Sequence, residues 1–366
     1  MHFLVSLLNL RPGRIGGAET YLRALVSRFS QHQGADRITL LLHRDLEREF
    51  ADSNLDCHVV DFGERGATWR RGAEALTGWR ARGLERHIAR LAPDAMLFPQ
   101  QSLFPRQPPC PAVLTVFDLY HLQSANALPL AERIFRRGIY GYSLKRADRL
   151  IAISECTRQA LIACAGIAPD RVVAVPLGFD AVPTAASLAP PRIAGRYVYY
   201  PAATWPAKNH AVLFETLAHV RRRAEWGDRQ LVLSGIQTRL WPRLQRLVAQ
   251  LGLDDIVRHL GYVPAAEVQA LYAGAEAVLF PSRFEGFGLP VLEAAALGKK
   301  VIVSQLEVFR ELGVPERFRI DFTQPEQLLR ALAEPGPTVL EKSPATWDEC
   351  TIRTLDVLRD AAGRPR

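Results

Sequence analysis

Short apolar runs alternate with amphipathic stretches along the whole chain. The amphipathic stretches place apolar residues three and four positions apart, as at Tyr21, Leu22, Leu25, Val26 and Phe29, which predicts helices. The apolar runs between them predict buried strands. These strands are expected at residues 2–10, 37–43, 57–62, 95–98, 112–118, 149–154 and 171–176, and then at 197–201, 230–235, 256–263, 277–280, 300–304 and 318–321. Because strands that alternate with helices form parallel sheets, we predict an α/β protein.

The strands fall into two series, one on each side of a break in the pattern. Residues 181–195 are rich in Pro and Ala and have no hydrophobic periodicity, which is typical of a linker. The chain of 366 residues is long enough for two domains of ordinary size. We therefore predict a first domain at 1–180, a linker at 181–195, a second domain at 196–344 and a final helix within 345–366.

The composition is that of a soluble globular protein, with 48% hydrophobic and 23% charged residues. No apolar run reaches the roughly 20 residues that span a bilayer. The amino terminus lacks the basic segment and cleavage site of a signal peptide and predicts a buried strand instead. The five cysteines are scattered without a C-x-x-C spacing, which predicts free thiols, no structural metal site and a cytoplasmic protein.

The net charge of +8 points to an anionic partner. Nucleic acid is one such partner, but the sequence has no helix-turn-helix, zinc-finger or RNA-binding sheet pattern. Anionic membrane surfaces and phosphate-bearing substrates explain the charge better. Two arginine-rich helical stretches with aromatic residues among them, 64–92 and 133–149, are either solvated helix faces or a membrane-surface patch on the first domain.

Residues 280–298 carry the strongest candidate chemistry in the chain. A strand leads into the loop 285–288, EGFG, and a helix follows in which Pro290 occupies the first turn, where a missing N–H costs little. The backbone N–H groups and the dipole of such a helix start attract a phosphate or another anion. The two glycines let a ligand approach the backbone closely.

Two carboxylates bracket this loop. Glu285 lies within it, and Glu293 lies about one to two turns inside the helix. Because a carboxylate repels phosphate, we expect each glutamate to bind hydroxyl groups instead. A diphosphate between two hydroxyl-bearing rings is the structure of a nucleotide-sugar. The alternative is an ordinary strand, loop and helix of an α/β protein with incidental glutamates.

Two further candidate regions lie in the first domain. A loop with Gly13, Gly16 and Gly17 precedes the first helix and is a second possible anion site, although it lacks the G-x-G-x-x-G pattern of dinucleotide binding. Asp118 and His121 follow the strand at 112–118, at the edge where parallel sheets bind ligands. The alternatives are a plain strand-helix turn for the glycines and a structural hydrogen-bonding role for the histidine.

One more candidate region opens the second domain. Lys208 lies just past the end of the first strand, and Asn209 is suited to cap the helix that follows. An isolated lysine is usually a surface residue, so its position alone assigns it no role.

The stretch from Glu285 to Glu293, EGFGLPVLE, resembles the E-x7-E motif of retaining glycosyltransferases of the GT-B fold, especially glycosyltransferase family 4. Its flanks, PS before it and EAAALGKKVIVS after it, match that motif too. The segments ISECTRQAL, VPLGFD and YPAATWPAKNH are similar to other parts of the family. The resemblance implies two doubly wound, Rossmann-like domains that face each other across a cleft, the first on the acceptor side and the second binding the nucleotide-sugar. It also implies that the last helix crosses back to the first domain.

The resemblance implies a role for each candidate residue as well. Glu285 is expected to hold the sugar hydroxyls and Glu293 the ribose, while Asp118 or His121 lines the sugar-acceptor side. The donor diphosphate is expected to contact Lys208, Gly16 and Gly17, and the backbone N–H groups of Gly286, Phe287, Gly288 and Leu289.

Two positions depart from the family pattern. Family members usually have His where Phe117 stands, and many have Arg where Ala203 stands. His121 is a candidate to replace the missing histidine, and Arg14 or Arg283 is a candidate to replace the missing arginine.

Together these features predict a retaining hexosyltransferase that moves a sugar from a nucleoside diphosphate to an acceptor hydroxyl. The sequence has no D-x-D pattern, and a lysine with a helix dipole can neutralise the diphosphate, so we expect no metal and no cofactor. No carboxylate nucleophile is evident, which fits a front-face reaction in which the leaving phosphate helps to deprotonate the acceptor.

The segment YPAATWPAKNH resembles bacterial enzymes of O-antigen, lipopolysaccharide and exopolysaccharide assembly. This favours mannose, a GDP- or UDP-linked donor, and a glycan or polyprenyl-diphosphate-linked acceptor. We expect a cytoplasmic enzyme, peripheral on the inner face of the cytoplasmic membrane, that binds no nucleic acid. The alternatives are a nucleotide-sugar epimerase of GT-B fold and a non-catalytic nucleotide-sugar binding protein. The sequence does not specify the base, the linkage formed or the oligomeric state.

Overall fold

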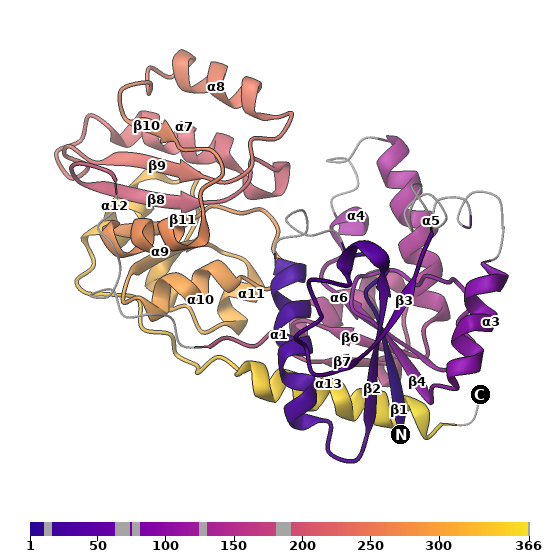
Figure 1. Ribbon diagram of the computed structural model, residues 1–366. Coiled ribbons are helices and arrows are strands. Elements are labelled where there is room, and N and C mark those ends of the chain that lie inside the picture. The colour runs from indigo at the N-terminus through magenta and orange to yellow at the C-terminus, as the bar shows by residue number, and fades with distance from the viewer. Residues whose placement is uncertain (11–16, 63–73, 75–80, 124–129, 181–191, 365–366) are drawn as a thin grey trace. The chain divides into compact units, whose positions relative to one another are not determined.

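The computed structural model describes residues 1–10, 17–62, 74, 81–123, 130–180 and 192–364. Arg14, Gly16, most of the predicted linker and much of the first arginine-rich stretch lie outside the described residues. The chain divides into two compact units: unit 1 contains Met1–Gly178 and Ala345–Arg366, and unit 2 contains Phe179–Pro344. Each unit is built around one parallel sheet (Figure 1).

Unit 1 holds a sheet of seven parallel strands in the order β3-β2-β1-β4-β5-β6-β7. The order reverses at β1, where Phe3 pairs with Ile38 of β2 on one side and with Ala95 of β4 on the other. Such a reversal opens a crevice at the carboxyl ends of the two central strands, where open α/β sheets bind ligands. The strands are β1 (His2–Ser6), β2 (Arg37–His43), β3 (Asp56–Val60), β4 (Ala95–Phe98), β5 (Ala112–Val116), β6 (Arg149–Ala152) and β7 (Val172–Ala174).

Helices cover both faces of this sheet, because right-handed crossovers change face where the strand order reverses. Helices α1 and α13 pack against each other, and α13 also contacts β4, β5 and β6 (Figure 1). On the other face, α5 packs against β5, and α6 packs against β6 and β7. The helices of unit 1 are α1 (Gly17–His32), α3 (Arg82–Leu91), α4 (Tyr120–Gln123), α5 (Leu130–Arg146), α6 (Glu155–Ala165) and α13 (Trp347–Ala362).

The last helix, α13, lies in unit 1 although its sequence follows unit 2. A capping box at Thr346 starts it. Asp348 in its first turn pairs with Arg28 of α1 at 3.4 Å, and Arg359 near its end pairs with Asp36 at 2.8 Å. Its buried face therefore covers part of the first sheet, and its ion pairs fix its direction along α1.

Unit 2 repeats the arrangement with six parallel strands in the order β10-β9-β8-β11-β12-β13. Here the order reverses at β8, which pairs with β9 on one side and with β11 on the other. The strands are β8 (Tyr197–Pro201), β9 (Gln230–Ser234), β10 (Val257–His259), β11 (Ala277–Phe280), β12 (Lys300–Ser304) and β13 (Arg319–Ile320). The helices are α7 (His210–Val220), α8 (Trp241–Gln250), α9 (Ala265–Gly274), α10 (Leu289–Ala296), α11 (Glu307–Glu311) and α12 (Pro325–Ala333).

The predicted strands all form, but several are shorter than predicted. The first strand was expected to reach residue 10, whereas β1 ends at Ser6 and Leu7, Leu8 and Leu10 are buried beyond it. The edge strand β10 keeps only three residues of an expected run of eight. The predicted lengths were too long because a run of apolar residues indicates burial, and residues stay buried beyond the last hydrogen-bonded residue of the strand. Ser154, predicted to cap α6, does so: its Oγ accepts the Thr157 N–H at 3.0 Å.

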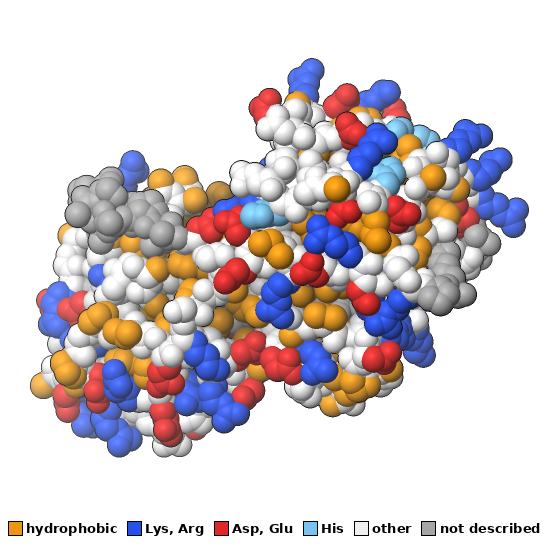
Figure 2. All heavy atoms as spheres, turned by 90° about the horizontal axis from the view of Figure 1, so that it is seen from below, with side chains coloured by type: hydrophobic (Ala, Val, Ile, Leu, Met, Phe, Trp, Pro, Cys, Tyr) orange, Lys and Arg blue, Asp and Glu red, His pale blue; other side chains and the backbone are white. Residues whose placement is uncertain are grey.

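Positive and negative side chains are mixed on the face of the molecule that Figure 2 shows. On the face shown in Figure 2, Lys and Arg side chains lie among Asp and Glu side chains and form no continuous basic stripe. All five cysteines are free thiols, as predicted. None of the helices in the described ranges is long and apolar enough to cross a membrane.

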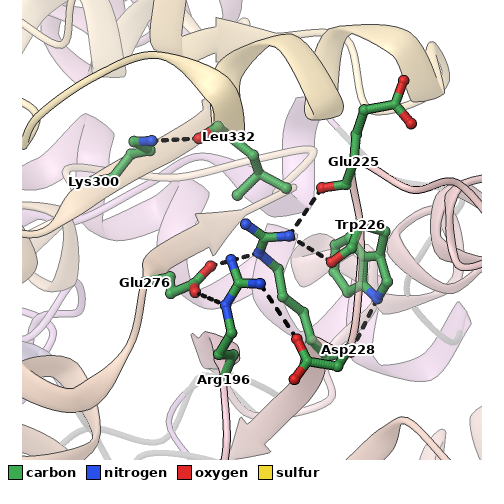
Figure 3. Close-up of polar contacts among 8 residues, drawn as sticks. Arg196, Glu225, Trp226, Asp228, Glu276, Lys300 and Leu332 are labelled. Carbon is green, nitrogen blue, oxygen red and sulfur yellow. Dashed lines mark hydrogen bonds and ion pairs between the residues drawn. The ribbon is translucent and has the colours of Figure 1, made fainter.

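A charged clamp holds together the amino ends of three neighbouring strands of unit 2. Arg196, Arg229 and Glu276 directly precede β8, β9 and β11. The Glu276 carboxylate accepts hydrogen bonds from both guanidinium groups, one on each oxygen (Figure 3). Arg229 also donates to the carbonyl of Glu225 at 2.9 Å. Burial raises the pKa of Glu276, but the hydrogen bonds from Arg196 and Arg229 outweigh it, so the pKa lies below its ordinary value of 4.5.

We expect the Glu276→Gln variant to lose about 1–2 kcal/mol of unfolding free energy at neutral pH, because the amide can accept from only one of the two arginines. A carboxyl whose pKa is lowered by folding stabilises the protein above about pH 4.5, and this contribution disappears as the pH falls through the folded-state pKa. Thermal unfolding from pH 7 to pH 3 should therefore show the wild-type and variant Tm values converging in acid.

Asp228→Asn is the matched control for this prediction. Among the described residues, the Asp228 carboxylate has one ion-pair partner, the exposed Arg196, with the Arg196 Nη1 to Asp228 Oδ1 distance at 3.3 Å, so its loss should change the Tm little. Equal Tm losses for the two variants, or a Glu276→Gln loss that does not depend on pH, would contradict the clamp.

Candidate functional site

The reversal of strand order in unit 2 brings two predicted site residues into contact. Lys208 follows β8 and Glu285 follows β11, and these two strands are neighbours in the sheet. The Lys208 Nζ lies 2.6 Å from Glu285 Oε1, and both side chains are partly buried. The two loops are separated by many residues in sequence, but parallel strands end at the same edge, which places their loops side by side.

Neighbouring groups fix the position of both side chains. The Ser282 hydroxyl donates to the same Glu285 oxygen at 2.6 Å. The Ser304 hydroxyl, at the end of β12, donates to the Ser282 carbonyl. The hydroxyl of buried Tyr200 donates to the Lys208 carbonyl at 2.7 Å. Hydrogen bonds from β8, from the loop after β11 and from β12 therefore hold the residues of the ion pair, and its geometry is preorganised.

The start of α10 lies directly after Glu285. Gly288 is the N-cap of this helix and provides no side chain to cap the first-turn N–H groups. Its φ of 122° is strained for any residue with a Cβ, and a Cβ there would lie 3.1 Å from Leu312 Cδ1. Phe287 is buried and anchors the loop, while Leu289 begins the helix at the predicted position. The conformation of Gly288 therefore leaves the first-turn N–H groups of α10 without a side-chain cap.

Glu293 lies further along α10, mostly buried, in the second turn. The Tyr272 hydroxyl of α9 donates to its Oε2 at 3.3 Å. Burial raises the pKa of the Glu293 carboxyl, and the tyrosine hydrogen bond only partly offsets this effect. A half-satisfied buried carboxylate still has acceptor capacity, which suits it to hydroxyl groups of a ligand.

Two further residues, Asn209 and Arg283, lie next to this pair. Asn209 does not cap α7: it adopts a left-handed conformation, and its side-chain amide donates to the Pro281 carbonyl at 3.0 Å. The predicted cap is therefore wrong, because the asparagine ties the β8 and β11 loops together instead. The Arg283 N–H donates to the Ala207 carbonyl at 2.8 Å, and its side chain lines a pocket between α7 and α8.

The predicted site residues of unit 1 follow β5. Asp118 Oδ1 accepts the N–H of Tyr120 at 3.0 Å, which shapes the turn into α4. Phe117, at the position where a histidine was expected, packs edge-on against Tyr21 of α1 with ring centroids 5.6 Å apart. Gly17, the described part of the first glycine loop, begins α1 at the end of the β1 crevice.

His121 is fully buried, with 0% of its surface exposed. Its ring packs edge-on against Tyr140 of α5, and neither ring nitrogen has a hydrogen-bond partner among the described residues. Burial lowers the pKa of His121 to about 4, with further lowering from Arg136 and Arg137, so the imidazole is neutral at neutral pH. The structure thus encloses this side chain, where the sequence suggested a residue facing a ligand.

Several residues of the site had no clear signal in the sequence. Ser282 lies in the PS pair before the motif, which is the only hint of its bond to Glu285. Tyr272 and Tyr200 belong to apolar runs and looked like core residues. Sequence periodicity assigns such tyrosines to the interior without showing where their hydroxyl groups point. In the described part of the chain, no group of three or more His, Cys, Asp or Glu side chains is placed to hold a metal ion.

Two family models match the chain, one on each unit. Residues 15–182 match the model described as Glycosyltransferase Family 4, and residues 194–334 match the model described as Glycosyl transferases group 1. The second match contains Lys208, Glu285 and Glu293.

Curated relatives and solved structures agree with these matches. The chain is 29% identical to the MMP α-(1→4)-mannosyltransferase of Mycolicibacterium hassiacum over 47% of this chain and 40% of that protein. It is 27% identical to the O-antigen chain mannosyltransferase B of Escherichia coli over 59% of this chain and 62% of that protein. The matches thus span about half the length of these curated relatives. A crystal structure of Anabaena HepE in complex with UDP and glucose superposes with a TM-score of 0.61 at 17% identity, covering 98% of this chain and 95% of that one.

These findings confirm the predicted fold class, two parallel-sheet α/β domains of GT-B type. The two family matches leave unmatched, between residues 15 and 334, only the segment 183–193. The chain belongs to the group 1 glycosyltransferases of glycosyltransferase family 4.

Proposed function

We propose that this chain is a retaining hexosyltransferase that takes a sugar from a nucleoside diphosphate and passes it to an acceptor hydroxyl. The observation that carries the proposal is the Lys208–Glu285 pair, held at the strand reversal of unit 2 directly before the uncapped start of α10. A cation and a helix start suit a diphosphate, while a carboxylate in the same place suits hydroxyl groups.

The hydrogen-bonding capacity of the pair fits both partners at once. Lys208 Nζ has three donors and gives one to Glu285, so two remain for phosphate oxygens. Glu285 uses Oε1 for both Lys208 and Ser282, and Oε2 has no partner among the described residues. That oxygen is available to accept from sugar hydroxyls. Glu293, on the next turns of α10, is the proposed acceptor for the ribose hydroxyls.

In the proposed reaction, these groups stabilise the departing diphosphate as its negative charge develops. Lys208 and the N–H groups at the start of α10 supply the compensating positive charge, so the reaction needs no divalent ion and no cofactor. Retention follows from a front-face reaction in which the leaving phosphate accepts the acceptor proton. Asp118 of unit 1 is the proposed residue on the sugar-acceptor side.

The proposed donor is a GDP- or UDP-linked hexose, with mannose favoured because the relatives from Mycolicibacterium hassiacum and Escherichia coli are named mannosyltransferases. The UDP and glucose of the HepE structure support the choice of a nucleotide-sugar in general. The proposed acceptor is a glycan, free or linked to a polyprenyl diphosphate, in the assembly of bacterial surface polysaccharide. Chromatography of the products with and without acceptor distinguishes this transfer from epimerisation of the donor.

A second candidate function is binding of a nucleotide-sugar without catalysis. It is favoured by the packing of Phe117 against Tyr21 and by the burial of His121, which leave no histidine at the expected place. Measurable hydrolysis of the donor by the purified chain would exclude this function.

The first prediction from the proposed function concerns nucleotide binding. A thermal-shift screen with UDP, GDP, ADP, TDP and CMP should identify one nucleoside diphosphate that, at about 100 times its Kd, adds about 2.7 kcal/mol of stability. Lys208→Ala and Glu293→Gln should weaken its binding at least tenfold, because each removes a charged hydrogen-bonding group from the ligand.

Glu293→Gln makes the test specific for function. Without ligand its Tm should equal or exceed that of the wild type, because burial disfavours the carboxylate and the amide oxygen still accepts from Tyr272. Lys342→Ala, which removes an exposed lysine of the same unit, is the control and should bind nucleotide normally. No shift with any nucleotide, or normal shifts in both site variants, would refute the donor site.

We also propose that unit 1 binds an anionic membrane surface. Two consecutive large apolar side chains of α5 are exposed, Ile134 by 61% and Phe135 by 37%. Arg133, Arg136 and Arg137 flank them on the same helix. Apolar side chains that enter the interface and arginines that meet lipid head groups are the features of an interfacial helix.

The membrane proposal predicts flotation of the chain with vesicles of phosphatidylglycerol and much less with vesicles of phosphatidylcholine. The double variant Ile134→Ser, Phe135→Ser should bind at least tenfold more weakly, since burying either side chain contributes about 1.5–3 kcal/mol. Ile352→Ser on α13 removes a similarly exposed isoleucine and should leave binding unchanged. Equal flotation of all three proteins would rule out α5 as the contact.

A further inference from the structure

A pocket outside the donor site lies between α7 and α8 of unit 2. Its volume is about 480 Å³, which is within the range of pockets that hold small organic ligands. Helices α7 and α8 contact each other (Figure 1). The first residues of α7 line the pocket. It is separate from the Lys208–Glu285 contact, because neither of those residues lines it.

The charge of the pocket is strongly positive. Arg243 and Arg246 reach it from α8, Arg283 reaches it from the β11 loop, and Glu215 is the single acidic residue that lines it. Over the described ranges, none of the three guanidinium groups lies within ion-pair distance of a carboxylate, whereas many other arginines of the chain do have such partners. Like charges that share one hollow repel each other, and an anion in the pocket removes that repulsion.

The backbone adds to the attraction for an anion. Asn209, His210 and Ala211, the start of the eleven-residue α7, line the pocket. The Asn209 side chain would ordinarily cap these first-turn N–H groups, but its amide is directed to the Pro281 carbonyl instead. The positive end of the helix dipole therefore faces the same pocket as the three arginines.

Apolar residues line the same pocket. They are Leu244 and Leu247 of α8, its N-cap Leu240, and Pro206. A site of this size that combines cations with leucines suits a molecule larger than a bare inorganic ion. From the arginines without carboxylate partners, the uncapped helix start and the leucine lining, we propose that this pocket binds a small phosphorylated organic molecule, with its phosphate on Arg243, Arg246 and Arg283.

The pocket is tested by titration calorimetry of the full chain with inorganic pyrophosphate as the probe. The Lys208→Ala variant serves as the background, because it removes the cation of the donor site. In this background we expect one pyrophosphate to bind per chain, more weakly as salt is added. Adding Arg243→Ala and Arg246→Ala should weaken that binding at least tenfold, while the unliganded Tm stays unchanged because both side chains are exposed.

Arg222→Ala in the same background is the matched control, since Arg222 is an exposed arginine of unit 2 that does not line the pocket. It should leave pyrophosphate binding as it is. Absence of pyrophosphate binding in the Lys208→Ala chain, or equal loss in the control, overturns the pocket. The donor site is tested separately, by measuring nucleotide binding to a double variant that carries Arg243→Ala and Arg246→Ala and keeps Lys208. The two proposals can therefore fail independently.

Discussion

The parallel pairing of β8 with β11 is the constraint on which the candidate site depends. Because the two strands run in the same direction, both end at one edge of the sheet, and the order reversal keeps any other strand from separating them. Lys208 and Glu285 meet for this reason, with no local sequence preference for each other. The clamp of Arg196, Arg229 and Glu276 secures the opposite ends of the same strands. One part of the sheet is thus fixed at both edges.

In each unit, loops that follow strands of the sheet carry candidate site residues. In unit 2 the loops after the strands carry Lys208, Glu285 and Gly288, whose positive φ requires glycine, and the hydrogen bond from Asn209 to Pro281 joins these loops. In unit 1 the corresponding edge carries Asp118 and an enclosed His121. Among the described residues, the chemically specialised groups are therefore concentrated in unit 2, which fits its proposed task of holding the nucleotide-sugar.

Two residues, Asn209 and His121, occupy positions suited to a predicted role but do not take that role in the structure. Asn209 had the residue type and place of a helix cap, yet its amide bonds to a carbonyl of another loop, and α7 begins uncapped. His121 stood at a strand end where ligands bind, yet its ring packs against Tyr140 inside unit 1. In both cases the side chain interacts with a residue that is distant in sequence but adjacent in the folded chain, and it does so in place of the role that its local sequence predicts.

The sequence by itself determined the strand and helix series, the two-sheet plan and the motif from Glu285 to Glu293, since hydrophobic period and glycine placement act over a few neighbouring residues. It placed β2, β4, β8, β11 and β12 at their observed bounds. Only the tertiary structure decided which loops meet, where Tyr272 and Ser282 direct their hydroxyl groups, and that Arg283 shares one pocket with two arginines of α8. Those contacts depend on strand order and side-chain direction, which residues distant in sequence fix together.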